Sequence, residues 1–241
     1  LTYWSGLMAT KIVKLENGFS VWTRKVGTGG VPVLLLHGGP GMTHEYLEPF
    51  SEYFKNQDVT LYYYDQLGSY FSDQPADTSL WDIDRFVNEI EQVRKSFSLE
   101  KFILYGQSFG GLLAMEYAYK YQKYLKGLIV SNMVDSMDVY RKYMVVLKDS
   151  FGEKISDLIT KLENTNRMAS PEYQKVVQQM YAEHFCRLDP WPEPVVRSFA
   201  HTNPVVGTHM LGPKVFDVVG SVKNWHIDDR LSTITTPTLV L

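Results

Sequence analysis

Four short apolar runs, with helix-like segments between them, are the feature that most restricts how this chain can fold. The runs are VPVLLLH at 31–37, VTLYYYD at 59–65, KFILYG at 101–106 and LKGLIVSN at 125–132. Continuous apolar runs of this length are typical of strands covered on both faces. The intervening segments predict one helix beginning near Glu45, a second over 82–97 and a third over 111–121. Strands that alternate with helices predict an α/β fold, with a mostly parallel sheet flanked by helices.

The two ends of the chain extend this pattern, and its middle interrupts it. TKIVKL and FSVWTRKV lie on either side of an Asn17-Gly18 turn, which predicts a β-hairpin at 10–26. After Asn132 the sequence becomes helical and rich in loops, with Tyr140, Tyr143, Met144 and Leu147 spaced as one helix face. A strand is expected again at 238–241. We therefore expect three parts: the first part of an α/β core at 1–132, a helical cap at 133–224 and a return to the core at 225–241.

Composition excludes several classes of function. The net charge of −3 and the pI of about 6.1 do not favour nucleic acid or an anionic membrane as a partner. No run approaches the length of a membrane-spanning helix, and no group of His, Asp or Glu has the spacing of metal ligands. We therefore expect no metal and no cofactor. The single Cys186 cannot form an internal disulfide, which fits a cytoplasmic location.

A serine lies between two glycines where a predicted strand meets a predicted helix. The sequence there is Gly-Gln-Ser-Phe-Gly at 106–110. A strand that turns sharply into a helix is the setting of a nucleophile elbow, which presents a serine hydroxyl above the sheet. Gly106 and Gly110 would allow the strand and helix to approach closely. The alternative is that Ser108 merely caps the helix after a glycine turn.

A second glycine motif, His37-Gly38-Gly39-Pro40-Gly41, follows the first buried run. Such a loop can aim backbone N–H groups at a developing oxyanion, together with the N–H of Phe109, the residue after the serine. It lacks the Lys-Ser/Thr and the spacing of a phosphate-binding loop. We expect His37 to orient the loop by hydrogen bonding rather than to act as general base.

HGGPG, then YYDQLGSYFSDQP, then GQSFGG together resemble the proline iminopeptidases, serine peptidases of the α/β-hydrolase fold. The resemblance implies that Ser108 is the acylated nucleophile and that Gly39 and Phe109 supply the oxyanion N–H groups. The turn at Asp65 and Gln66 would pack beside the active site. The expected substrate is a peptide with a free N-terminal proline, or another small apolar residue, bound under the cap. A small amide or ester is a further possible substrate.

The first departure of this sequence from the family concerns the catalytic acid and base. In the family, both follow the strand that here reads TPTLVL, so we expect them beyond Leu241 and expect the chain as given to turn over substrate poorly. Asp135 could hold an acid position that some hydrolases use. The remaining histidines fall in the first helix, the cap and the return from it: His44, His184, His201, His209 and His226.

A second departure concerns the substrate. Family members usually carry a cap glutamate in a Gly-Pro-x-Glu stretch, where its carboxylate binds the α-ammonium group, and this sequence has Val215 at that position. An amino-acid amidase or carboxylesterase on the same fold therefore remains an alternative. An alternative of another class is a catalytically silent hydrolase scaffold that binds a small molecule in the cap.

Overall fold

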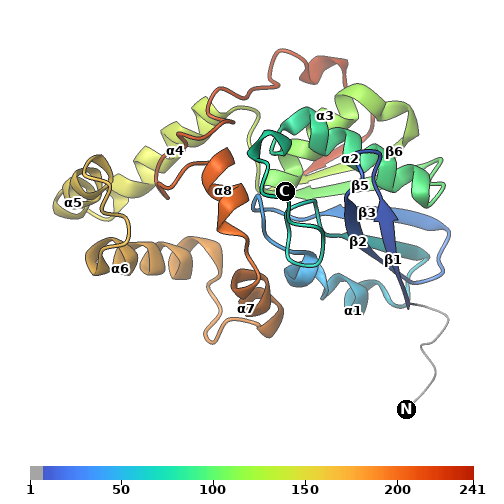
Figure 1. Ribbon diagram of the computed structural model, residues 1–241, viewed down its shortest axis with the longest axis horizontal. Coiled ribbons are helices and arrows are strands. Elements are labelled where there is room, and N and C mark those ends of the chain that lie inside the picture. The colour runs from blue at the N-terminus through green and yellow to red at the C-terminus, as the bar shows by residue number, and fades with distance from the viewer. Residues whose placement is uncertain (1–7) are drawn as a thin grey trace.

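The computed structural model describes residues 8–241, which form a seven-stranded sheet with helices on both faces and a helical cap to one side (Figure 1). The strand order is β1-β2-β4-β3-β5-β6-β7, and the strands from β3 to β7 run parallel. The strands are β1 Met8–Lys14, β2 Ser20–Val26, β3 Val31–Leu36, β4 Val59–Tyr64, β5 Phe102–Gln107, β6 Leu125–Ser131 and β7 Thr238–Val240. The predicted α/β fold with a mostly parallel sheet is confirmed.

The N-terminal hairpin forms where the Asn17-Gly18 turn predicted it. β1 pairs antiparallel with β2, and the Leu15 N–H donates to the Phe19 carbonyl at 2.7 Å to close the turn. Gly18 has a φ of +89°, which a glycine adopts without a steric penalty. β2 then pairs antiparallel with β4 and joins the hairpin to the parallel part of the sheet.

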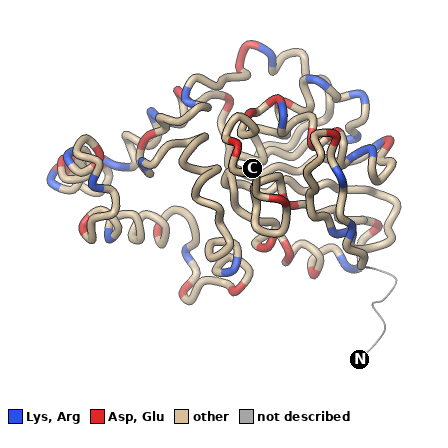
Figure 2. Tube along the Cα trace, in the orientation of Figure 1, with Lys and Arg blue, Asp and Glu red and all other residues tan. Residues whose placement is uncertain are grey.

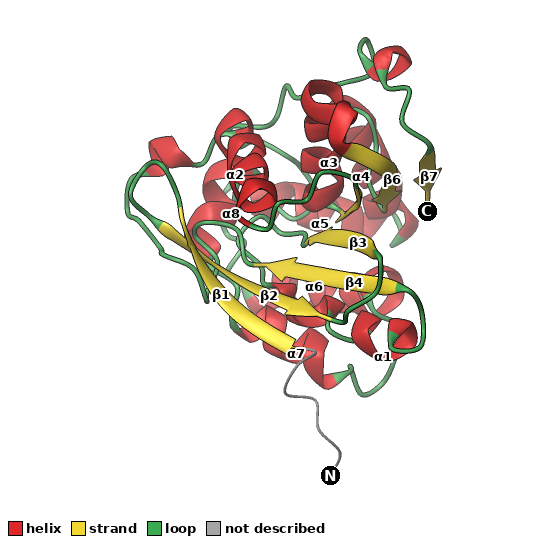
Figure 3. Cartoon of the chain, turned by 90° about the vertical axis from the view of Figure 1, so that its right-hand side faces the viewer, coloured by secondary structure: helices red, strands yellow, loops and turns green. Residues whose placement is uncertain are grey.

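Alternate side chains of the central strands enter separate cores on the two faces of the sheet. Leu34 and Leu36 pack with α2 (Ile83–Ser96) and α3 (Phe109–Tyr121) on one face. Leu35 packs on the other face, where Phe50 of the short α1 (Phe50–Phe54) also lies. Figure 3 shows α2 and α3 on one side of the strands and α1 on the other. Coverage of both faces explains why these strands read as continuous apolar runs.

Helix α2 forms as its sequence predicts, whereas the helix expected near Glu45 is not one continuous α-helix. The Asp82 carboxylate caps α2 by accepting from the Arg85 N–H at 3.2 Å. The segment after the glycine loop is instead a 3₁₀ turn over His44–Leu47, followed by α1. Pro49 lacks the N–H that would continue a helix, and it stands at the N-cap of α1.

The cap contains five α-helices, which lie beside the core in Figure 1, and a π-helical turn at Tyr181–Phe185. The α-helices are α4 Met137–Ser150, α5 Glu153–Asn164, α6 Pro171–Met180, α7 Glu193–Ala200 and α8 Pro204–Met210. Helices α4 to α6 share an apolar cluster of their own that includes Met144 and Leu147. Tyr143, predicted on the same face, is 56% exposed instead. Val206 and Met210 of α8 are buried in the main core.

Charged residues of both signs are interspersed along the chain, as Figure 2 shows. Among residues 8–241, no helix combines the length and the apolar character that crossing a membrane requires.

Candidate active site

Ser108 lies at the junction of β5 and α3 in a backbone conformation that residues other than glycine rarely adopt. Its φ is +53° and its ψ is −123°. The Ser108 N–H donates to the Ser131 carbonyl at 2.9 Å, which ties the turn to the end of β6. The hydroxyl makes no cap hydrogen bond to α3. Simple helix capping therefore does not explain the serine, and a strained residue at such a turn is typical of a functional site.

Close backbone contacts require glycine at both Gly106 and Gly110, on either side of Ser108. A Cβ on Gly106 would overlap the carbonyl oxygen of Gly110 one turn later. A Cβ on Gly110 would come within 2.7 Å of the His37 carbonyl oxygen. The elbow is therefore packed directly against the start of the glycine loop, as its expected role requires.

The glycine loop faces the serine. A Cβ on Gly38 would lie 3.1 Å from the Ser108 Cβ. The Gly38 N–H donates to the Tyr46 hydroxyl at 2.6 Å. Among residues 8–241, the N–H groups of Gly39 and Phe109 have no hydrogen-bond partner. These are the two N–H groups that the sequence assigned to the oxyanion, and both remain available for one.

His37 is buried beneath the loop as a neutral, oriented ring. Its Nε2 accepts from the Gln66 N–H at 3.1 Å, so its Nδ1 carries the proton and donates to the Gly38 carbonyl at 2.7 Å. Burial lowers the pKa of His37 and keeps the ring neutral. Gln66 also donates through its side chain to the His37 carbonyl at 2.9 Å. The Asp65-Gln66 turn therefore supports the loop from beside it.

No hydrogen bond joins Ser108 to a histidine within residues 8–241. His44 pairs with Asp65 at 2.7 Å, and His201 pairs with Glu45 at 2.7 Å. His226 pairs with Asp228 in an exposed loop, and His184 lies near Glu183 in the cap. His209, in the last turn of α8, has no side-chain partner among the described residues. The structure therefore brings Ser108 together with the glycine loop but with no general base from this part of the chain.

Asp135 and Val215 make no hydrogen bond to Ser108 among the described residues. Asp135 follows β6 and lines an apolar cavity of about 500 Å³ between α3, β6, α4 and the returning chain. The Val215 side chain packs on the apolar cluster of α4 to α6. Its N–H donates to the Tyr173 hydroxyl at 2.9 Å, and that hydroxyl donates to the buried Glu163 at 2.8 Å.

Three residues near the site have contacts that the sequence did not predict: Tyr46, Gln107 and Asn203. Gln107 precedes the nucleophile, and its side-chain oxygen accepts from the Tyr46 hydroxyl at 2.7 Å. The Asn203 N–H, from the cap, donates to the Gly41 carbonyl at 2.8 Å. Only Gln107 stood inside a recognised motif, so motif spacing alone could not identify the other two.

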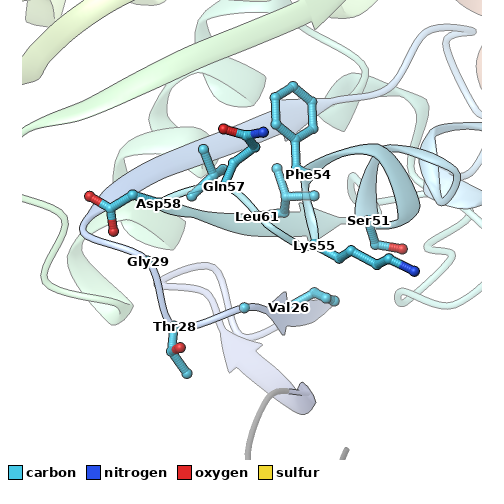
Figure 4. A pocket seen from close by; sticks show the side chains of 11 residues that line it. Val26, Thr28, Gly29, Ser51, Phe54, Lys55, Gln57, Asp58 and Leu61 are labelled. Atoms are coloured by element: carbon cyan, nitrogen blue, oxygen red, sulfur yellow. The ribbon is translucent and has the colours of Figure 1, made fainter.

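Two further features lie away from the elbow. A cavity of about 300 Å³ is lined by residues such as Val26, Lys55 and Val59 (Figure 4). Val59 begins β4, whereas Ser108 follows the end of the parallel β5, so this cavity opens at the opposite edge of the sheet. Within residues 8–241, one group of three ligand-type side chains comes together, at His226, Asp228 and Asp229. All three are exposed, as such groups often are without a metal.

The model of the alpha/beta hydrolase fold family matches residues 31–185. The proline iminopeptidase of Flavobacterium johnsoniae is 47% identical over 228 residues, which cover 92% of this chain and 77% of that relative. The proline iminopeptidase of Chitinophaga pinensis is 43% identical, over 95% of this chain and 79% of that relative.

Two solved structures match nearly the whole chain. The crystal structure of the proline iminopeptidase of Mycobacterium smegmatis matches with a TM-score of 0.87 and 28% identity, over 96% of this chain and 80% of its own. The crystal structure of VinJ matches with a TM-score of 0.90 and 30% identity over the same shares. These matches confirm the resemblance that the HGGPG and GQSFGG motifs indicated. The chain belongs to the proline iminopeptidase family of the α/β-hydrolase fold.

Proposed function

We propose that this protein is a serine peptidase that releases N-terminal proline from peptides through an acyl-enzyme on Ser108. The chemical part of the proposal rests on one observation: the strained serine faces a glycine loop, and among residues 8–241 the Gly39 and Phe109 N–H groups have no hydrogen-bond partner. The proline iminopeptidases among its relatives support the substrate class. They favour it over an amidase, a carboxylesterase or a silent binding scaffold.

The reaction divides into two acyl transfers. The Ser108 hydroxyl oxygen attacks the carbonyl carbon of the N-terminal residue and gives its proton to a general base. The carbonyl oxygen gains negative charge, which the N–H groups of Gly39 and Phe109 would stabilise by hydrogen bonding. The peptide bond then breaks, and the remaining peptide leaves with a proton as a free amine. Water attacks the acyl-enzyme in the same way and releases the amino acid.

The family resemblance implies a general base and an acid that orients it. Within residues 8–241, the histidines close to the glycine loop have structural partners instead, since His37 bonds Gly38 and His44 bonds Asp65. We therefore propose Ser108 as the nucleophile and Gly39 and Phe109 as the oxyanion donors.

Recognition of a free amine is the substrate feature that distinguishes an aminopeptidase from an esterase or amidase. Val215 places an apolar side chain where a carboxylate was expected, so the amine must be bound by other groups. The proposed partner is a peptide substrate. The proposed location is the cytoplasm, which the lone Cys186 supports because it cannot form an internal disulfide.

The test compares hydrolysis of a prolyl arylamide with hydrolysis of the same compound acetylated on its nitrogen. A peptidase that needs a free N-terminus loses nearly all activity on acetylation. Equal rates on both compounds would overturn the aminopeptidase assignment. A fluorophosphonate that labels activated serines, followed by intact mass measurement, reports in parallel whether Ser108 is activated.

A further inference from the structure

Asn203 joins the cap to two loops of the active site. Its backbone N–H donates to the Gly41 carbonyl at 2.8 Å, at the end of the glycine loop. Its side-chain amide Nδ2 donates to the Gly68 carbonyl at 2.8 Å, in the turn that follows β4. Its Oδ1 accepts from the Val205 N–H at 3.0 Å and caps α8. One residue of the cap therefore uses its backbone donor and both side-chain polar atoms to hold two core loops and a helix.

The surrounding packing leaves little room for these loops to shift. A Cβ on Gly41 would come within 2.6 Å of the Asn203 carbonyl oxygen. A Cβ on Gly68 would come within 2.8 Å of a methyl group of Val206. Gly41 and Gly68 both have positive φ values, so glycine is required at each for its backbone conformation as well.

The helix before Asn203 is itself attached to the residues that follow the glycine loop. Arg197 of α7 forms an ion pair with the buried Glu45 at 2.7 Å. Ser198, fully buried, donates to the Thr43 carbonyl at 3.2 Å. The Thr43 hydroxyl also donates to Glu45 at 2.7 Å. Both ends of the segment from α7 to α8 therefore contact the core around the glycine loop, whereas α4 to α6 pack mainly on one another.

We infer that Asn203 is a positioning residue for the oxyanion-binding loop. Its side chain bonds Gly68 and so holds the Asn203 backbone N–H against the Gly41 carbonyl. The loop that carries the Gly39 N–H thereby keeps the conformation that aims this group at the reacting carbonyl. This inference rests on the proposed peptidase function. The α7–α8 segment would then help to hold the oxyanion donor in place. This matters for the rate, because a displacement of such a donor by about 1 Å can cost on the order of a hundredfold.

Asn203→Asp distinguishes the role of Asn203 in positioning the glycine loop from its role in capping α8. The carboxylate can still cap α8, but it places an acceptor against the Gly68 carbonyl in place of a donor. We expect kcat for a prolyl arylamide to fall about tenfold or more, with KM changed less than about twofold. Asn203→Ala removes the cap and the donor together. Its matched control is Ser170→Ala, which removes the N-cap of α6 in the distal cap, where Ser170 accepts from the Tyr173 N–H.

Amide hydrogen exchange supplies a readout that does not depend on turnover. In both Asn203 variants, exchange in peptides covering 37–47 should be about tenfold faster or more, because local opening of the loop becomes easier. Ser170→Ala should leave both this exchange and kcat at the wild-type values.

Unchanged loop exchange and unchanged kcat in both Asn203 variants would overturn the inference. Equal loss of kcat in Ser170→Ala would also overturn it, since general loosening of the cap would then explain the effect. If wild-type protein that also contains a general base hydrolyses no prolyl arylamide, the proposed function fails, and the exchange measurement still decides the role of Asn203.

Discussion

The Tyr46 hydroxyl donates a hydrogen bond to the Gln107 side-chain oxygen at 2.7 Å and accepts one from the Gly38 N–H at 2.6 Å. It thereby connects the residue before the nucleophile with the glycine loop. Burial raises the pKa of Tyr46, so the phenol keeps the proton it donates. The bridge also occupies the Gly38 N–H and leaves the neighbouring Gly39 N–H available for an oxyanion.

Tyr46→Phe removes this bridge while preserving the ring. The Gly38 N–H and Gln107 both lose a buried partner, and the loop loses one of its fixed points. We expect kcat to fall about tenfold with little change in KM. Tyr53→Phe is the control, because Tyr53 is 82% exposed. Equal steady-state kinetics of the two variants would show that the bridge has no catalytic importance.

Ser108→Ala should abolish covalent labelling by a fluorophosphonate and leave the fold intact. The hydroxyl makes no side-chain hydrogen bond to the described residues, and alanine can occupy the same strained backbone position as serine. Intact mass after labelling, together with the thermal unfolding midpoint, checks both statements. Wild-type turnover in this variant would contradict the assignment of Ser108 as nucleophile.

Gly106→Ala should destabilise the protein, because the new Cβ overlaps the Gly110 backbone. Overpacking at such a contact typically costs about 1–3 kcal/mol. Gly127→Ala is the matched control, since Gly127 also lies in a parallel strand but a Cβ there meets only ordinary contacts at 3.7 Å. Urea unfolding of both variants provides the comparison. If Gly106→Ala were no less stable than Gly127→Ala, the elbow would not require close strand–helix contact.

Glu116→Ala should loosen the returning chain from α3. The buried carboxylate accepts from the Trp225 indole at 2.8 Å and from Arg230 at 3.0 Å through both oxygens. Removing one partner of a buried pair costs about 3–5 kcal/mol, and partial exposure of Arg230 should reduce this to about 2 kcal/mol. Asp84→Ala breaks the exposed pair with Lys120 and should change stability by less than about 1 kcal/mol. Similar losses in the two variants would contradict this account.

His44 makes stability depend on pH. Burial opposes its charge, but hydrogen bonds to Asp65 and Glu48 outweigh that effect and raise the pKa of His44 above its ordinary value of 6.5. A raised pKa stabilises the fold fully below 6.5, and the stabilisation disappears as pH rises through the folded-state pKa. His37 acts in the opposite sense, because burial lowers its pKa and its contribution is lost as pH falls below 6.5.

His44→Gln isolates the first of these contributions. Between about pH 6 and about pH 9, the wild type should lose more free energy of unfolding than the variant does. Urea unfolding at the two pH values measures the difference. An identical pH dependence in both proteins would show that His44 does not titrate with the predicted sign.

Much of the fold and the centre of the site could be read from contiguous residues. The strands at 31–37, 59–65, 101–106 and 125–132 form nearly as predicted, and so do the hairpin and α2. Ser108 stands at a strand–helix turn, and Gly38 lies beside it in the glycine loop, because both motifs specify local backbone geometry. The helix expected near Glu45 begins at His44 but is not continuous, since Pro49 divides the segment into a 3₁₀ helix and a short α-helix.

The alternation of strands and helices, the elbow and the glycine loop could be predicted from local sequence, because each depends on the period or backbone freedom of neighbouring residues. The distant side chains that hold these parts in place became visible only in the folded chain. Tyr46 and Gln107 are 61 positions apart, and Arg197 and Glu45 are 152 apart. No local periodicity marks such pairs, since their hydrogen bonds exist only once the sheet and the cap have brought the segments together.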